Sequence, residues 1–126
     1  MIPIRDVNPS HRTPIVNITL IVLNVLAFFW ELSLGPDLPA QLNRVAFIPA
    51  RFWSGETLVA DTLTIFFAMF LHGGWLHLGS NMLYLWIFGD NIEDRLGHGK
   101  YLVFYLACGV LATLSHAIMS PASSIP

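Results

Sequence analysis

The sequence predicts an all-α membrane protein, and three observations lead to this fold class. Hydrophobic residues make up 55% of the 126 positions, and charged residues only 11%. The mean hydropathy is +0.63. Three apolar stretches are long enough to cross a bilayer, which is not expected of a soluble domain of this size. Residues 1–126 are therefore predicted to form one membrane domain or part of one.

Charge and cysteine content exclude further classes. The formal net charge of −2 provides no basic field for a nucleic acid, so no nucleic-acid partner is expected. Cys108 is the single cysteine of the sequence, so an internal disulfide is impossible. The lipid bilayer is the partner that the composition predicts.

The first membrane helix is predicted over about 14–34. A helix of this length measures about 31 Å, which matches the hydrocarbon thickness of a bilayer. Its apolar part is longer than the apolar region of a signal peptide, so we interpret it as a retained helix. Asn17, Asn24 and Glu31 recur every seven residues and form one polar stripe, which is expected to face other helices. Glu31 is expected to be hydrated near the outer interface and to have no catalytic role.

The second membrane helix is predicted over about 75–93 and the third over about 101–119. Apolar sequence also precedes the second helix, but the paired glycines Gly73 and Gly74 favour a break there. Residues 35–74 are therefore predicted to be a long loop that lies partly in the membrane. This loop either gates a site below it or is an interfacial hairpin with a positional role only.

The distribution of positive charge predicts the orientation. Arg5 and Arg12 precede the first helix, and Arg95 and Lys100 lie in the short turn between the second and third. The positive-inside rule then places the N-terminus and this turn in the cytoplasm, with residues 35–74 facing outward.

Three polar side chains interrupt the apolar sequence around the second helix: His72, His77 and Asn81. Burying such groups in hydrocarbon costs several kcal/mol unless they find partners or a water-filled cavity, so they indicate a functional site. His77 and Asn81 are four residues apart and share a helix face. A zinc site is disfavoured because the histidines are five apart across a helix break, with no acid nearby. Haem ligation by His77 and His116 is a weaker alternative, because small residues leave little room for a porphyrin.

Nucleophilic catalysis is the remaining chemistry. The imidazole N–H of His77 and the carboxamide N–H of Asn81 could both donate to a developing oxyanion. No G-x-S-x-G or G-x-S-G motif occurs, and Ser80 points about 100° away from Asn81 on a helix. The residues alone thus predict an oxyanion hole without a nucleophile.

The charged turn after the second helix is interpreted as structural. Glu93 and Arg95 are expected to bond helix ends and each other, and Gly97 to provide a positive-φ cap. The turn lies a membrane's width from His77, so no catalytic role is assigned to it.

Two spaced patterns resemble the rhomboid family of intramembrane serine proteases. They are His72-x4-His77-x3-Asn81 and Glu93-x-Arg95-x-Gly97-x3-Tyr101, in this order. The opening residues 2–10 (IPIRDVNPS), the Ala-Arg-Phe-Trp of residues 50–53 and FLHGGWLH also resemble bacterial members. The resemblance covers essentially the whole chain.

The resemblance implies three helices of a six-helix bundle, in an integral protein of the bacterial inner membrane. It implies hydrolysis of transmembrane protein substrates with no metal or cofactor. His77 and Asn81 would be oxyanion-hole donors and His72 would support the site, while Glu93 and Arg95 would brace the first loop or the turn.

One departure from the family is large. The family places its nucleophile serine, in a G-x-S-G motif, and its base histidine on later helices. Neither the motif nor those helices occur in these 126 residues. We therefore expect the sequence to be the N-terminal half of a protease, which needs its missing C-terminal helices and is inactive alone. The alternative is a non-catalytic rhomboid-like module that binds transmembrane clients.

Overall fold

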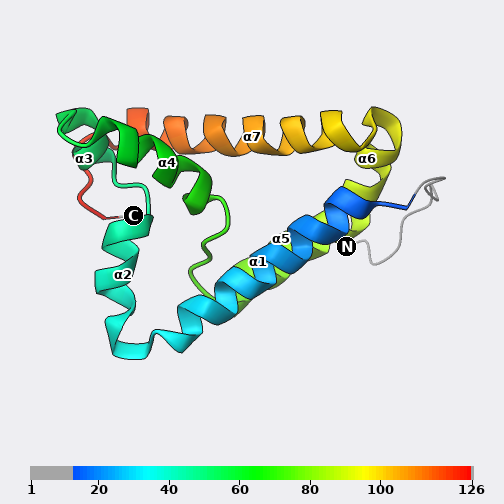
Figure 1. Ribbon diagram of the computed structural model, residues 1–126, viewed down its shortest axis with the longest axis horizontal. Helices are drawn as coiled ribbons and strands as arrows, with labels where there is room; N and C mark the ends of the chain where they lie inside the picture. The colour runs from blue at the N-terminus through cyan, green and yellow to red at the C-terminus, as the bar shows by residue number, and fades with distance from the viewer. Residues whose placement is uncertain (1–12, 126) are drawn as a thin grey trace. The chain divides into compact units, whose positions relative to one another are not determined.

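The computed structural model describes residues 13–125, and every regular element in that range is helical (Figure 1). The elements in chain order are α1 Ile15–Ser33, η1 Gly35–Asp37, α2 Leu38–Val45, α3 Pro49–Ser54, α4 Leu58–Ala68, α5 Trp75–Tyr84, η2 Leu85–Gly89, α6 Asp90–Leu96 and α7 His98–Met119. The all-α prediction is confirmed. The opening motif of residues 2–10 lies outside the described residues, and so do Arg5 and Arg12.

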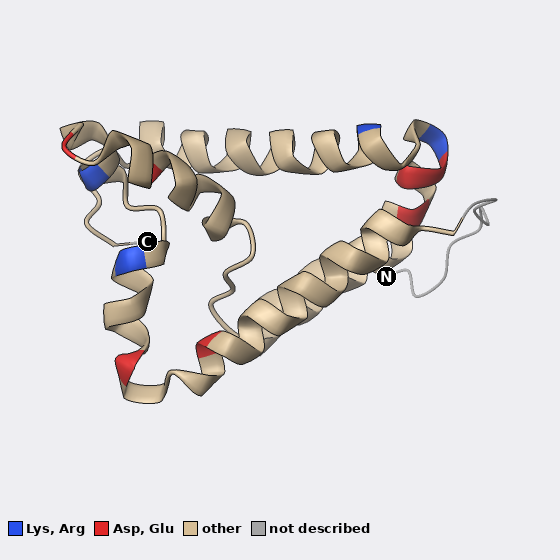
Figure 2. Cartoon of the chain, viewed as in Figure 1, with Lys and Arg blue, Asp and Glu red and all other residues tan. Residues whose placement is uncertain are grey.

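Among residues 13–125, two helices are long and apolar enough to cross a membrane, α1 and α7. They correspond to the helices predicted over 14–34 and 101–119. Figure 2 shows that the charged residues gather near helix ends, and α7 carries none from Tyr101 to Met119. The helix predicted over 75–93 begins at Trp75 as expected, but it consists of α5, the π-helical turn η2 and α6. The backbone stays right-handed helical where these parts join, at Leu85 and Asp90.

Residues 35–74, predicted as one long loop between two membrane helices, include several short helices. They contain η1, α2, α3 and α4, and the break predicted at Gly73 and Gly74 lies between α4 and α5. Prolines stand in the first turns of α2 and α3, where a missing N–H is tolerated, and Gly55 ends α3 with a φ of 73°. Helices of six to eleven residues are too short to show a clear period in the sequence, so the pattern does not predict them individually.

The chain divides into two compact units. The first comprises Met1–Phe28 and His72–Tyr105, and the second comprises Phe29–Leu71 and Leu106–Pro126.

In the first unit, α1 and α5 lie side by side and run antiparallel (Figure 1). The Asn17 side chain contacts the Leu85 carbonyl at one end, and the Phe28 and Trp75 rings meet edge to face at the other, 4.9 Å apart. This pairing fixes α5 against α1.

In the second unit, α3 and α4 pack on the C-terminal part of α7. Phe47, Ile65 and Ala117 form its buried apolar cluster. The Trp53 indole N–H donates to the Ala117 carbonyl at 2.9 Å. The Met69 side chain packs against Gly109, where it occupies the space that a Cβ would need.

The polar stripe on α1 is buried, as predicted for a face directed at other helices. Asn17 and Asn24 are each 1% exposed. Glu31 is 5% exposed, so the expectation that it is hydrated near the interface was wrong. The seven-residue spacing places it on the same inward face as the two asparagines, and that face is covered along the whole helix.

Candidate functional site

His72 lies in the short break that precedes α5. The α-helix α4 ends at Ala68, and Gly74 is extended before α5 begins at Trp75. His72 is 6% exposed, and its ring packs edge to face against that of His77, with centroids 5.0 Å apart. The diglycine therefore brings the two histidines together, although they are five residues apart across a helix break.

His77 and Asn81 are exposed on consecutive turns of α5. The backbone N–H of Gly73 donates to Nδ1 of His77 at 3.3 Å. A neutral imidazole that accepts at Nδ1 carries its proton on Nε2. The outer edge of the His77 ring is thus a hydrogen-bond donor, and the Asn81 carboxamide offers a second donor one turn away.

Two serines, one on α5 and one on α7, donate to their own helices. The Ser80 hydroxyl donates to the Leu76 carbonyl at 2.8 Å, and the Ser115 hydroxyl to the Leu111 carbonyl at 2.8 Å. The Ser80 hydroxyl also lies 3.2 Å from the His77 carbonyl, but no hydrogen bond joins either hydroxyl to a histidine ring within residues 13–125. His116 is exposed on α7, in the second unit. No group of three or more His, Cys, Asp or Glu side chains that could hold a metal ion occurs in the described part of the chain.

Glu93 bonds the first turn of α1. Its carboxylate accepts from the backbone N–H groups of Val16 at 2.6 Å and Asn17 at 3.0 Å, and it lies 3.0 Å from Nδ1 of His98. Glu93 itself is 1% exposed. A carboxylate at this place satisfies N–H groups that have no partner inside α1 and complements the helix dipole.

Arg95 does not bond Glu93, contrary to the expectation that the two residues bond each other. It is exposed and makes no hydrogen bond or ion pair within residues 13–125. Residues two apart on a helix face different directions, and Glu93 is directed at α1. Gly97 follows α6 with a φ of 84°, and its N–H donates to the Glu93 carbonyl. A side chain would be strained at that φ.

Sequence reasoning gave no role to the side chain of Tyr101 and foresaw no specific partner for Asn17. The Tyr101 hydroxyl donates to Oδ1 of Asn17 at 2.6 Å, and Nδ2 of Asn17 donates to the Leu85 carbonyl at 2.7 Å. The Asn24 amide contacts the Tyr105 hydroxyl at 3.3 Å. The heptad of polar residues on α1 was a signal for buried partners, but it did not identify them.

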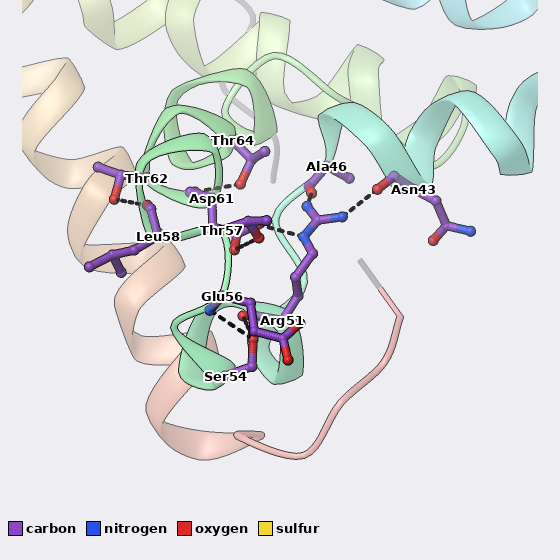
Figure 3. A network of polar contacts seen from close by, with 10 residues as sticks. All are labelled: Asn43, Ala46, Arg51, Ser54, Glu56, Thr57, Leu58, Asp61, Thr62 and Thr64. Atoms are coloured by element: carbon purple, nitrogen blue, oxygen red, sulfur yellow. Dashed lines mark hydrogen bonds and ion pairs between the residues drawn. The ribbon is translucent and has the colours of Figure 1, made fainter.

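Sequence reasoning also missed an ion pair in the second unit. Arg51 donates through Nε to Asp61 at 2.5 Å and through its terminal nitrogens to the carbonyls of Asn43 and Ala46 (Figure 3). The Thr57 hydroxyl donates to the other Asp61 oxygen at 2.7 Å. This network joins α2, α3 and α4. An acid within the apolar segment Leu58–Ala68 was the available signal, since a buried carboxylate needs a partner.

Comparison with known proteins agrees with the resemblance noted above. The family model described as Rhomboid domain matches residues 59–125. Rhomboid protease AarA of Providencia stuartii is 26% identical over 102 residues, which are 81% of this chain and 36% of that protein. Rhomboid protease GluP of Bacillus subtilis is 39% identical over 51 residues, which are 40% of this chain and 10% of that protein.

A plant protein is similar as well. Rhomboid-like protein 11, chloroplastic, of Arabidopsis thaliana is 36% identical over 58 residues, which are 46% of this chain and 21% of that protein. The chain thus spans about a third or less of the length of these curated relatives. No solved structure matches it significantly. The family match covers more than half of the 126 residues and includes α5, α6 and α7, so the chain belongs to the rhomboid family, the family of intramembrane serine proteases.

Proposed function

We propose that this chain is the N-terminal part of an intramembrane serine endopeptidase and supplies its oxyanion hole. His77 and Asn81 are the two donors, and His72 supports the His77 ring from the buried side. The observation that carries the proposal is the hydrogen bond from Gly73 to Nδ1 of His77, because it leaves the ring proton on Nε2 of this exposed residue.

The chemistry follows from the two donors. Attack on a peptide carbonyl places negative charge on its oxygen, and preorganised N–H groups in a site shielded from bulk water stabilise that charge. His77 and Asn81 lie on one face of α5, so the Nε2–H and Nδ2–H groups can converge on one oxygen atom. The packing of His72 against His77 restricts rotation of the His77 ring. The Nε2–H bond of His77 therefore keeps one direction.

Nucleophile and base are proposed to come from further helices of the same protein. The hydroxyls of Ser80 and Ser115 donate to backbone carbonyls of their own helices, which does not activate them as nucleophiles. We therefore expect the 126-residue polypeptide alone to hydrolyse no transmembrane substrate. A fluorogenic transmembrane peptide in liposomes checks this, and cleavage by the polypeptide alone would contradict it.

The proposal includes three membrane spans: α1, the run from α5 to α6, and α7. Arg95 and Lys100 lie between the second and third spans, and Arg5 and Arg12 precede the first. Their distribution supports a cytoplasmic N-terminus, with residues 35–74 at the outer face. The similarity to rhomboid proteases of two bacteria supports a bacterial membrane as the location, and membership of the rhomboid family supports transmembrane proteins as substrates.

The test uses the product of the complete reading frame that contains these residues, reconstituted in liposomes with a transmembrane substrate. His77→Ala and Asn81→Ala are each expected to lower kcat by roughly 10²–10³, the usual loss for one oxyanion donor. KM should change little, because the donors act on the transition state.

Ser80→Ala is the matched control, since Ser80 lies next to Asn81 on the same helix and donates only to backbone carbonyls. Its kcat should equal that of the unaltered protein. If Asn81→Ala were as active as Ser80→Ala, the assignment of the donors would be wrong.

A non-catalytic membrane module that binds transmembrane clients is the second candidate. Sequencing the source DNA past Pro126 separates the two: a G-x-S-G helix and a later histidine-bearing helix support the protease, and a stop codon supports the module.

A further inference from the structure

A π-helical turn interrupts the helix that carries the candidate site. The turn η2, Leu85–Gly89, joins α5, which carries His77 and Asn81, to α6, which carries Glu93. A π-turn inserts one residue into an α-helical path. Because an α-helix has 3.6 residues per turn, one residue corresponds to a rotation of about 100°. The turn therefore determines how α5 is rotated relative to the anchored helix α6.

Asn17 of α1 bonds this turn with one end of its carboxamide and Tyr101 of α7 with the other. Nδ2 donates to the carbonyl of Leu85, the first residue of the turn, at 2.7 Å. Oδ1 accepts from the Tyr101 hydroxyl at 2.6 Å. The Asn17 side chain is among the largest fully buried groups of the described residues. In such surroundings a hydrogen bond is stronger than in water, and its loss is costly.

Gly89, the last residue of the turn, makes this contact possible. A Cβ at Gly89 would lie 2.6 Å from Cγ of Asn17 and 2.8 Å from the Tyr101 oxygen, which no ordinary packing allows. Gly89 is buried, and its conformation is ordinary helical, with a φ of −63°. The glycine is therefore required for space, so that the Asn17 amide can reach the turn.

A ring contact at the opposite end of α5 depends on how the helix is rotated. Trp75, the first residue of α5, meets Phe28 of α1 edge to face, with ring centroids 4.9 Å apart and an interplanar angle of 79°. A rotation of α5 by about 100° would move the Trp75 ring to another side of the helix and break this contact. All of these residues belong to the first unit.

We infer that Asn17 is a positioning residue for the site: its amide stabilises the π-turn Leu85–Gly89, and the turn sets the direction in which His77 and Asn81 face. The functional meaning of this inference rests on the proposed oxyanion role of those two residues. Asn17 itself contacts neither of them, and it acts through the backbone of the helix that carries them.

Two variants separate the amide bond from the rest of the contact. Asn17→Leu has the same number of side-chain heavy atoms in the same branched arrangement, and it loses both hydrogen bonds. Tyr101→Phe loses the bond to Oδ1 only and leaves the bond from Nδ2 to Leu85. A comparison of the two therefore isolates the effect of the Nδ2 donor on the turn.

The readout is NMR of the labelled 126-residue chain in detergent micelles. In Asn17→Leu, the ¹³C shifts of residues 85–89 should change to those of a regular α-helix, and the ring contact between Phe28 and Trp75 should be lost. In Tyr101→Phe both signatures should remain. If Asn17→Leu kept both signatures, or if both variants lost them alike, the inference would be overturned.

Deletion of Trp86 provides the rescue. Trp86 lies inside the turn and is 63% exposed, so its deletion removes the inserted residue without opening a core. The deletion should give a regular α-helix that keeps the contact between Phe28 and Trp75. It should also make Asn17→Leu harmless to that contact.

If Asn17→Leu does not fold alone, the variant that combines Asn17→Leu with deletion of Trp86 tests the inference. A folded double variant with the ring contact intact supports the inference, and an unfolded one shows that Asn17 acts otherwise than through the turn. These signatures do not depend on catalysis. If the oxyanion assignment were wrong, kcat would be unchanged in His77→Ala and Asn81→Ala, and the NMR result would be unaffected.

Discussion

Replacement of Glu93 by alanine is expected to destabilise the first unit by roughly 2–5 kcal/mol. The substitution removes the acceptor of two backbone N–H groups at the start of α1, and each unsatisfied buried donor costs about 1–3 kcal/mol. It also removes a negative charge from the N-terminal end of a helix dipole. Equilibrium unfolding of the chain in mixed micelles, followed by circular dichroism, measures the loss.

Two control variants test whether the lost carboxylate causes the loss of stability. Glu93→Gln keeps one carbonyl oxygen, so it should lose about half as much stability. Glu56→Ala removes an exposed acid from the second unit and should change the free energy of unfolding by less than about 0.5 kcal/mol. Amide hydrogen exchange should accelerate at Val16 and Asn17 in Glu93→Ala. Unchanged exchange at both amides would show that Glu93 does not cap α1.

Replacement of Arg51 by alanine is expected to cost the second unit about 3–5 kcal/mol, the usual effect of breaking a buried ion pair by removal of one partner. The Asp61 side chain is 2% exposed, so its carboxylate would remain buried without its cation. The carbonyls of Asn43 and Ala46 would lose a donor as well. Hydrogen exchange of the amides in α2, α3 and α4 should therefore accelerate.

Arg44→Ala is the matched control, since Arg44 is an exposed arginine of the same segment and makes none of the hydrogen bonds of this network (Figure 3). It should leave exchange in α3 and α4 unchanged. Arg51→Lys should rescue only part of the loss, because one ammonium group cannot reproduce the planar fork of donors. Equal exchange in Arg51→Ala and Arg44→Ala would contradict the role of the network.

The long helices could be predicted from the sequence because their signal is local. α1 and α7 are continuous apolar segments, and the break before α5 has two glycines. The helices within residues 35–74 could not be predicted in the same way, since each of them is short and depends on contacts such as the Arg51 network. The π-turn has no local signal at all, because the contact with Leu85 comes from Asn17, 68 positions away.

In the candidate site too, features with a local signal could be predicted from the sequence, and features that depend on distant residues could not. The spacing of His77 and Asn81 was enough to place both on one helix face, because that spacing is a property of the helix. The partners of Glu93 could not be read from its surroundings in the sequence. Arg95 is close along the chain but faces elsewhere, whereas the N-terminus of α1 lies more than seventy positions away and becomes a neighbour only through folding.

The central claim is that His77 presents a proton, rather than a lone pair, at its exposed edge. The ¹⁵N NMR spectrum of the His77 ring, recorded on the chain in micelles at alkaline pH, tests it most directly. We predict the tautomer with the proton on Nε2, as the hydrogen bond from Gly73 to Nδ1 requires. A neutral ring protonated on Nδ1 would contradict the claim, because its Nε2 would then carry a lone pair and could not donate to an oxyanion.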